Sequence, residues 1–310
     1  MNSDNKSTSS FGIFQYLNFL YRRLLRIVLN WFILFVTGET QLERMLAFTS
    51  THKGQITAEV EKLINEKEIQ LDSEIWNADQ EYEIATEIVD KYCSKVENKQ
   101  FDEMRDSLKK SLGQIRGYRE LCDAVEDLRI EKYDPGNEKH EKKLLKLWDL
   151  LMPMEDLRTR ITNQWQKIGF QGCDPATDFR GMGILSLDQL IFLAQYDVAH
   201  AHSILSISNH PLHGFPMAIT GINLTALTRQ LLTENALKMH FYNTVPGAPT
   251  INNFHHAYCQ IFKLFCAFWT KRKGEITYFN IIKKDFETQL IRHLISEDAN
   301  LDKLDAQFFQ

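Results

Sequence analysis

Arg180 is the residue whose type and setting most directly suggest chemistry in this chain. A guanidinium that is held rigidly and pointed outward can neutralise charge on the oxygens of a phosphoryl group transferred in a partner protein. Such an arginine raises the rate by about 10³ to 10⁵. The structural alternative is an internal ion pair with Asp174 or Asp178 that ties the loop together. The residues alone leave both interpretations open.

The segment around Arg180 contains the residues that build rigid turns. It extends from Trp165 to Gly183 and becomes crowded with Gly, Pro, Asp and Thr towards its end. Asp174 before Pro175 predicts an N-cap followed by the first position of a short helical turn. The arginine is also flanked by side chains that can bond back to the backbone and by glycines that leave room for a partner: Thr177, Asp178, Gly181 and Gly183.

Other kinds of reactive or ligand site are poorly supported. The sequence contains no Walker-type phosphate loop, and Gly181-Met-Gly183 lacks the third glycine of a dinucleotide fingerprint. Cys173 has no base that the sequence places beside it. We expect no metal site, because three histidine pairs have neither nearby cysteines nor an H-E-x-x-H pattern: His200 and His202, His210 and His213, His255 and His256.

Composition restricts the class of protein further. The 310 residues are 44% apolar, which is enough to bury a core, and the net charge is −5. The sequence also contains no long run of Lys and Arg interleaved with aromatic residues. The negative net charge and the lack of such a run predict that the protein does not bind nucleic acid. The five cysteines show neither C-x-x-C spacing nor a disulfide framework. We therefore expect a cytoplasmic protein.

The N-terminal segment Phe11–Val36 is aromatic and apolar, and its polar residues recur at helical spacing. They are Gln15, Asn18, Arg22, Arg26 and Asn30. Each arginine at the centre of a spanning helix costs about 2.5 to 3.5 kcal/mol. The pattern therefore favours an amphipathic helix lying peripherally in a membrane surface. The alternative is a helix that packs on protein.

In the rest of the chain, apolar residues recur at helical spacing. No segment shows the alternation of apolar and polar residues that is typical of a strand. We expect an all-α protein, with a single multi-helix domain behind the N-terminal amphipathic helix. At least three amphipathic helices are predicted between Gln55 and Arg129. The turn Asp134-Pro-Gly136 then marks a boundary. The predicted units are residues 1–40, the acidic helices 41–136, the main domain 137–300 and a tail 301–310.

Two local patterns after this boundary give specific predictions. The charged run Glu138–Lys143 is interpreted as the solvated face of a helix. Ser186 begins a sequence of capping-box form, Ser-Leu-Asp-Gln, which predicts the start of a helix. That helix should be broken by Asn209–Pro216, and further apolar and aromatic helices should follow from Met217 onward.

Several ordered motifs, taken with Trp165–Gly183, make the chain similar to the ELMO-domain family, in particular its branch of GTPase activators for Arf and Arf-like proteins. They are Leu147-Trp-Asp-Leu-Leu-Met-Pro153, Gly221-Ile-Asn-Leu-Thr225, His240-Phe-Tyr-Asn243 and Phe254-His-His-Ala-Tyr-Cys259. The resemblance covers about 144–294. Ser186 stands where the family commonly has Gly, a departure that bears on partner choice.

The resemblance implies an all-α ELMO-type domain that accelerates GTP hydrolysis by an Arf-like or Arf protein in its GTP state, with Arg180 as the catalytic arginine. It also implies a partner-binding surface around it: Gln171, Asp174, Thr177, Asp178, Phe179 and Gly181. GTP and Mg²⁺ would belong to the partner, so the chain itself would need no cofactor.

Two further expectations follow from the resemblance. The family branch that works as a scaffold with Dock-type exchange factors lacks Asp178-Phe-Arg-Gly181, which this chain keeps. The segment Phe11–Val36 resembles that of the activator branch, whose members associate with intracellular membranes. The alternative function is a non-catalytic adaptor that binds small GTPases or membrane-trafficking or cytoskeletal machinery.

Overall fold

The computed structural model describes residues 35–36, 38, 41–47, 53–66, 69, 75–93 and 98–305, and no strand occurs among them. The all-α prediction is therefore confirmed. The predicted amphipathic segment Phe11–Val36 lies outside the described residues, except for Phe35 and Val36, which are helical and exposed. No helix in the described ranges has both the length and the apolar character needed to cross a membrane.

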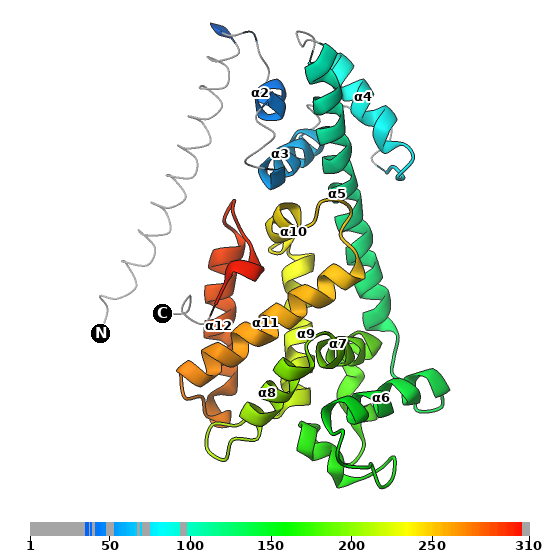
Figure 1. Ribbon diagram of the computed structural model, residues 1–310, viewed down its shortest axis with the longest axis vertical. Helices are drawn as coiled ribbons and strands as arrows, with labels where there is room; N and C mark the ends of the chain where they lie inside the picture. The colour runs from blue at the N-terminus through cyan, green and yellow to red at the C-terminus, as the bar shows by residue number, and fades with distance from the viewer. Residues whose placement is uncertain are drawn as a thin grey trace, which may run out of the picture.

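Four helices form one end of the molecule, drawn at the top of Figure 1. They are α2 (Gln41–Ala47), α3 (Lys53–Asn65), α4 (Glu81–Tyr92) and the first part of α5 (Asn98–Ile130). Helices α3, α4 and α5 correspond to the three predicted amphipathic helices. Helices α3 and α4 both pack on α5, and the apolar stripes of the three helices are buried, for example at Val60, Ile88 and Leu112.

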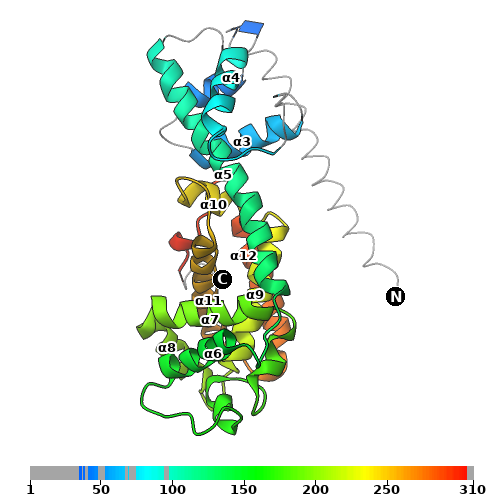
Figure 2. The ribbon, with the colours of Figure 1, turned by 90° about the vertical axis from the view of Figure 1, so that its right-hand side faces the viewer.

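The 33-residue helix α5 extends from this end along one side of the remaining helices, of which α7, α9, α10 and α11 contact it (Figures 1 and 2). These are α6 (Glu138–Leu151), α7 (Gly183–Tyr196), α8 (Val198–Ser208), α9 (Met217–Thr233), α10 (Lys238–Thr244), α11 (Ile251–Lys271) and α12 (Phe279–Leu294). Short 3₁₀ helices lie between them: η1 (Asn163–Ile168), η2 (Pro175–Arg180) and η3 (Ile276–Tyr278). A further one, η4 (Leu301–Lys303), follows α12.

Helix α7 packs against α5, α6, α9 and α11 and is buried along most of its length. The prediction that it begins at Ser186 is wrong, since it begins at Gly183. The N–H of Ile184 donates to the carbonyl of Glu131 beyond the end of α5 (2.9 Å), and buried Ser186 only bonds back to Gly183. The helix also ends earlier than predicted, because Asp197 caps a separate helix, α8, by accepting from the N–H of His200 (3.0 Å).

The predicted turn after α5 forms, with the Asp134 carboxylate accepting from the N–H of Gly136 (2.8 Å). Helix α6 follows, capped by Asn137. The interpretation of Glu138–Lys143 as a solvated face is correct for the exposed Glu138, Lys139 and Lys142 but wrong for the inner side of the helix. There His140 is 5% exposed, and Lys143 pairs with Asp188 of α7 at 2.6 Å. This face of α6 is attached to the core because it packs directly on α7.

Candidate functional site around Arg180

Arg180 is the last residue of η2, a short helix that forms as the sequence predicts. The backbone of Asp174 is extended, and its carboxylate accepts from the N–H of Ala176 (3.0 Å). Pro175 occupies the first turn, where an N–H would have no helical partner. The hydroxyl of Thr177 donates to the carbonyl of Asp174 (3.3 Å). Together these contacts fix the start of the turn that carries the arginine.

Asp178 fastens the same turn to the preceding loop, because its carboxylate accepts from the N–H of Gln171 (3.0 Å). Burial raises the pKa of this carboxyl, while the Gln171 N–H and the positive charge of Arg180 act in the opposite direction. Gln171 itself is exposed. The expected bonding of Thr177 and Asp178 back to the loop is therefore confirmed.

Phe179 anchors η2 in the core. Its side chain is 1% exposed and lies between the rings of Tyr133 (centroids 5.1 Å apart) and Phe170 (5.6 Å). Beyond Phe170 the aromatic packing continues into the buried rings of Trp165 and Trp148. The prediction that Phe179 contacts a partner is wrong for its side chain, because that side chain is buried among these rings.

The side chain of Arg180 is exposed, and its Nε donates to the carbonyl of Thr177 (2.9 Å). Within the part of the chain that the structure describes, no ion pair joins Arg180 to Asp174 or Asp178. The internal tie considered from the sequence is therefore not formed. One edge of the guanidinium is held by the backbone of its own turn, and its terminal amino groups remain available to another molecule.

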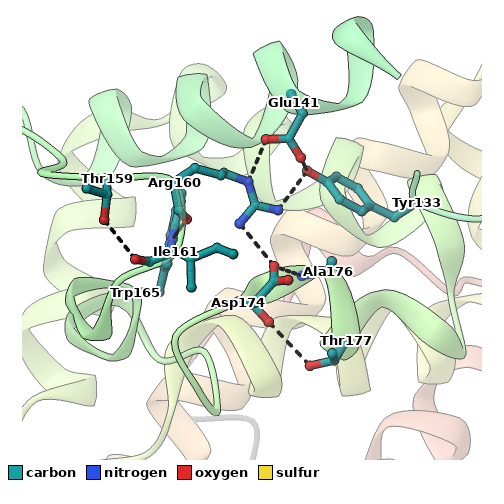
Figure 3. Close-up of polar contacts among 9 residues, drawn as sticks. All are labelled: Tyr133, Glu141, Thr159, Arg160, Ile161, Trp165, Asp174, Ala176 and Thr177. Atoms are coloured by element: carbon teal, nitrogen blue, oxygen red, sulfur yellow. Dashed lines mark hydrogen bonds and ion pairs between the residues drawn. The ribbon is translucent and has the colours of Figure 1, made fainter. Parts of the chain in front are cut away.

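A different arginine, Arg160, ties the loop to the body of the protein (Figure 3). Its Nε donates to Glu141 of α6 (2.5 Å), its Nη1 to Asp174 (3.0 Å) and its Nη2 to the hydroxyl of Tyr133 (3.4 Å). The Tyr133 hydroxyl in turn donates to Glu141. Burial by itself lowers the pKa of Arg160, but the hydrogen bonds to these groups outweigh it and raise the pKa, so the cation is firmly held.

The two glycines after Arg180 have different roles. Gly181 is exposed, with φ −85°, and a Cβ added there would meet nothing within 4 Å. It leaves open space beside the arginine, as predicted. Gly183 is buried with φ +53°, and a Cβ would lie 2.3 Å from the carbonyl oxygen of Glu131. The prediction that Gly183 leaves room for a partner is wrong, because it serves the close packing of α7 on the end of α5.

The other candidate residues do not assemble into a second site. Cys173 is exposed, and its carbonyl accepts from the N–H of Thr162 (2.9 Å). Among the described residues, no group of three or more His, Cys, Asp or Glu side chains could hold a metal ion. Sequence reasoning missed Arg160, Glu141 and Tyr133, which come from three separate segments. No motif joins them, so only the fold reveals the cluster.

Comparison with known proteins agrees with this architecture. The ELMO/CED-12 family profile matches residues 123–283. The chain is 39% identical over 276 residues to ELMO domain-containing protein 2 of Mus musculus, covering 88% of this chain and 92% of that protein. It is 43% identical over 213 residues to ELMO domain-containing protein 1 of Bos taurus, covering 63% and 65%. Identity to ELMO domain-containing protein B of Dictyostelium discoideum is 38% over 195 residues, covering 63% and 66%. The chain belongs to the ELMO/CED-12 family.

Proposed function

We propose that this protein is a GTPase-activating protein for Arf-like or Arf small GTPases, and that Arg180 is the catalytic residue it supplies in trans. The observation that carries the proposal is the state of Arg180, an exposed guanidinium on a tightly fixed turn. Among the described residues, the contact made by this guanidinium is that of its Nε with the carbonyl of Thr177. The acidic residues beside it are occupied elsewhere, Asp174 by Arg160 and Asp178 by Gln171.

This arrangement suits phosphoryl transfer. Hydrolysis of GTP develops negative charge on the phosphate oxygens, and a planar guanidinium can contact two of them at once. The partner GTPase holds the nucleotide and Mg²⁺, so the chain needs to deliver only the arginine. Gly181, which leaves open space beside Arg180, lets the partner surface approach closely. Gln171 and Thr177 are exposed on the same turn and are proposed to contact the partner.

The alternative is a non-catalytic adaptor that binds small GTPases or trafficking or cytoskeletal machinery through the same end of the molecule. An exposed apolar side chain beside the loop favours a binding surface of some kind, since Ile161 is 62% exposed and the N–H of the next residue, Thr162, donates to the carbonyl of Cys173 (2.9 Å). An adaptor would bind a GTPase without accelerating hydrolysis. Its binding would not depend on the guanidinium geometry of Arg180.

The test is single-turnover GTP hydrolysis by a panel of purified Arf and Arf-like proteins, with the full chain added in catalytic amounts. Wild type is compared with Arg180→Ala and with Arg158→Ala. Arg158 is an exposed arginine on a neighbouring loop and controls for the loss of one positive charge. The proposal expects acceleration by wild type and Arg158→Ala only. Binding without acceleration by any of the three would instead support the adaptor.

We also propose that the protein acts peripherally on the cytoplasmic surface of an intracellular membrane through Phe11–Val36. The support is the amphipathic sequence pattern, in which the arginines disfavour insertion across the bilayer. All five cysteines are free, in keeping with a reducing compartment. Deletion of residues 11–36 should abolish co-sedimentation with anionic phospholipid vesicles. Undiminished pelleting of the deleted protein would contradict this proposal.

A further inference from the structure

We propose that Arg160 is a positioning residue that fixes the direction in which Arg180 points, an inference that rests on the proposed GTPase-activating function. The two arginines do not touch. They are joined by a continuous series of hydrogen bonds, most of which is visible in Figure 3. The series begins at Glu141 on α6 and passes through Arg160, Asp174 and Thr177 before it reaches Arg180.

Each step of this series is a hydrogen bond. Glu141 accepts from Nε of Arg160 (2.5 Å), and Nη1 of Arg160 donates to the Asp174 carboxylate (3.0 Å). The carbonyl of Asp174 accepts from the Thr177 hydroxyl (3.3 Å), and the carbonyl of Thr177 accepts from Nε of Arg180 (2.9 Å). The first residue stands on a helix packed against α7, and the last stands at the exposed end of η2. The series therefore connects the rigid core to the free guanidinium.

The turn that carries Arg180 needs such an external support. It has only six residues, and 3₁₀ helices of this length have little stability of their own. The same oxygen of Asp174, Oδ1, accepts from both the N–H of Ala176 and Nη1 of Arg160. Arg160 thus holds the capping carboxylate in the position that starts the turn. Without it, the carboxylate would be free to rotate toward water, and η2 would lose its fixed orientation.

Arginine is the one side chain that can make all three contacts. Its planar fork directs separate N–H groups at Glu141, Asp174 and Tyr133, whereas a lysine ammonium at the end of a flexible stem cannot span them. The three charged side chains are also shielded, with exposures of 25% for Arg160, 21% for Glu141 and 34% for Asp174. The network is therefore less weakened by solvent than a surface ion pair.

The variants that test the role are Arg160→Lys, which keeps the charge but not the fork, and Arg160→Gln. Asp174→Asn is a further variant, because it keeps an acceptor for the Ala176 N–H while removing the charge that pairs with Arg160. The matched control is Arg158→Gln, which removes an exposed arginine two residues away. All are made in the full chain, and circular dichroism and thermal unfolding identify any variant that fails to fold.

The first measurement is amide hydrogen exchange of the peptide covering residues 174–182, which does not depend on any GTPase. We expect exchange at least about tenfold faster in Arg160→Gln and Arg160→Lys, with Arg158→Gln and the core peptides unchanged. Wild-type protection of this peptide in both folded Arg160 variants would overturn the inference. Hydrogen exchange tests the support of the turn by Arg160 even if wild type accelerates no GTPase in the panel. Such a lack of acceleration would refute the proposed function but would leave the exchange result valid.

The second measurement uses a GTPase that wild type does activate. We expect kcat to fall about 10- to 100-fold in Arg160→Lys, because misplacement of a catalytic group by about 1 Å has an effect of this size, while KM for the GTPase changes less than about threefold. In an Arg180→Ala background the same change should have no further effect. An equal fall in kcat in the wild-type and Arg180→Ala backgrounds would contradict the proposal that Arg160 positions Arg180. A change in KM with no change in kcat would contradict it as well.

Discussion

Replacement of Gly183 by alanine should destabilise the fold strongly. The residue has φ +53°, a left-handed conformation that costs an L side chain about 1–2 kcal/mol. Its new Cβ would also lie 2.3 Å from the carbonyl oxygen of Glu131 and 2.4 Å from that of Arg129. Both are backbone atoms at the end of α5, which cannot rotate away. Overpacking of this kind costs about 1–3 kcal/mol, and relief of the clash would break the Ile184–Glu131 hydrogen bond, worth about 1 kcal/mol.

The expected total loss is about 4 kcal/mol in the free energy of unfolding, which urea titration followed by circular dichroism would measure. The control is Gly181→Ala, two positions earlier. It has φ −85° and no atom within 4 Å of the added Cβ, so its stability should stay within about 0.5 kcal/mol of wild type. A loss below about 1 kcal/mol for Gly183→Ala would refute the argument that α7 begins against the backbone of α5.

Two further predictions concern stability. Burial lowers the pKa of both His240 and His255 to about 4 from an ordinary 6.5, so the folded protein binds fewer protons than the unfolded chain between these values. Stability should therefore be full above pH 6.5 and fall by up to about 3 kcal/mol per histidine as the pH drops toward 4. Urea titrations at pH 7, 5.5 and 4.5 test this, and a constant free energy of unfolding would contradict it. Gln114→Ala should cost about 2–4 kcal/mol in the same assay, because buried Gln114 donates to the carbonyls of Tyr242 (3.1 Å) and Val245 (2.5 Å) and accepts from Thr57 (2.5 Å). Gln230→Ala, a control in which a half-buried glutamine loses a hydrogen bond to exposed Glu234 (3.0 Å), should cost less than about 1 kcal/mol.

Sequence patterns predicted those features of the fold that depend on local spacing. The spacing of apolar residues predicted α3, α4 and α5. The residue types typical of caps and turns predicted the N-cap at Asp174 and the turn at Asp134. These predictions succeeded because the interactions involved lie within a few residues of one another. A capping carboxylate needs only the N–H groups that follow it, and a helical stripe needs only its own repeat.

The errors concern interactions between segments distant in the chain. Gly183 was expected to leave room for a partner, and its actual contact, the end of α5, was missed because it lies some fifty residues earlier. Glu141 was assigned to a solvated face because its partner Arg160 is not recognisable from local sequence. Phe179 was assigned to the partner surface because it adjoins Arg180, although its side chain is buried against Tyr133 and Phe170. Contacts between distant segments determine the surroundings of each of these residues. Such contacts cannot be predicted from the local spacing of residue types.

The proposed function depends on the guanidinium of Arg180 rather than on a positive charge at that position. The most direct measurement is the single-turnover rate of GTP hydrolysis by an activated Arf-family protein in the presence of wild type or Arg180→Lys, with binding of both measured in parallel. A lysine does not reproduce the planar fork. The account predicts unchanged folding and loss of most of the acceleration, which for an arginine of this kind is worth about 4 to 7 kcal/mol. If Arg180→Lys retained most of the wild-type acceleration, the catalytic role of Arg180 would be wrong.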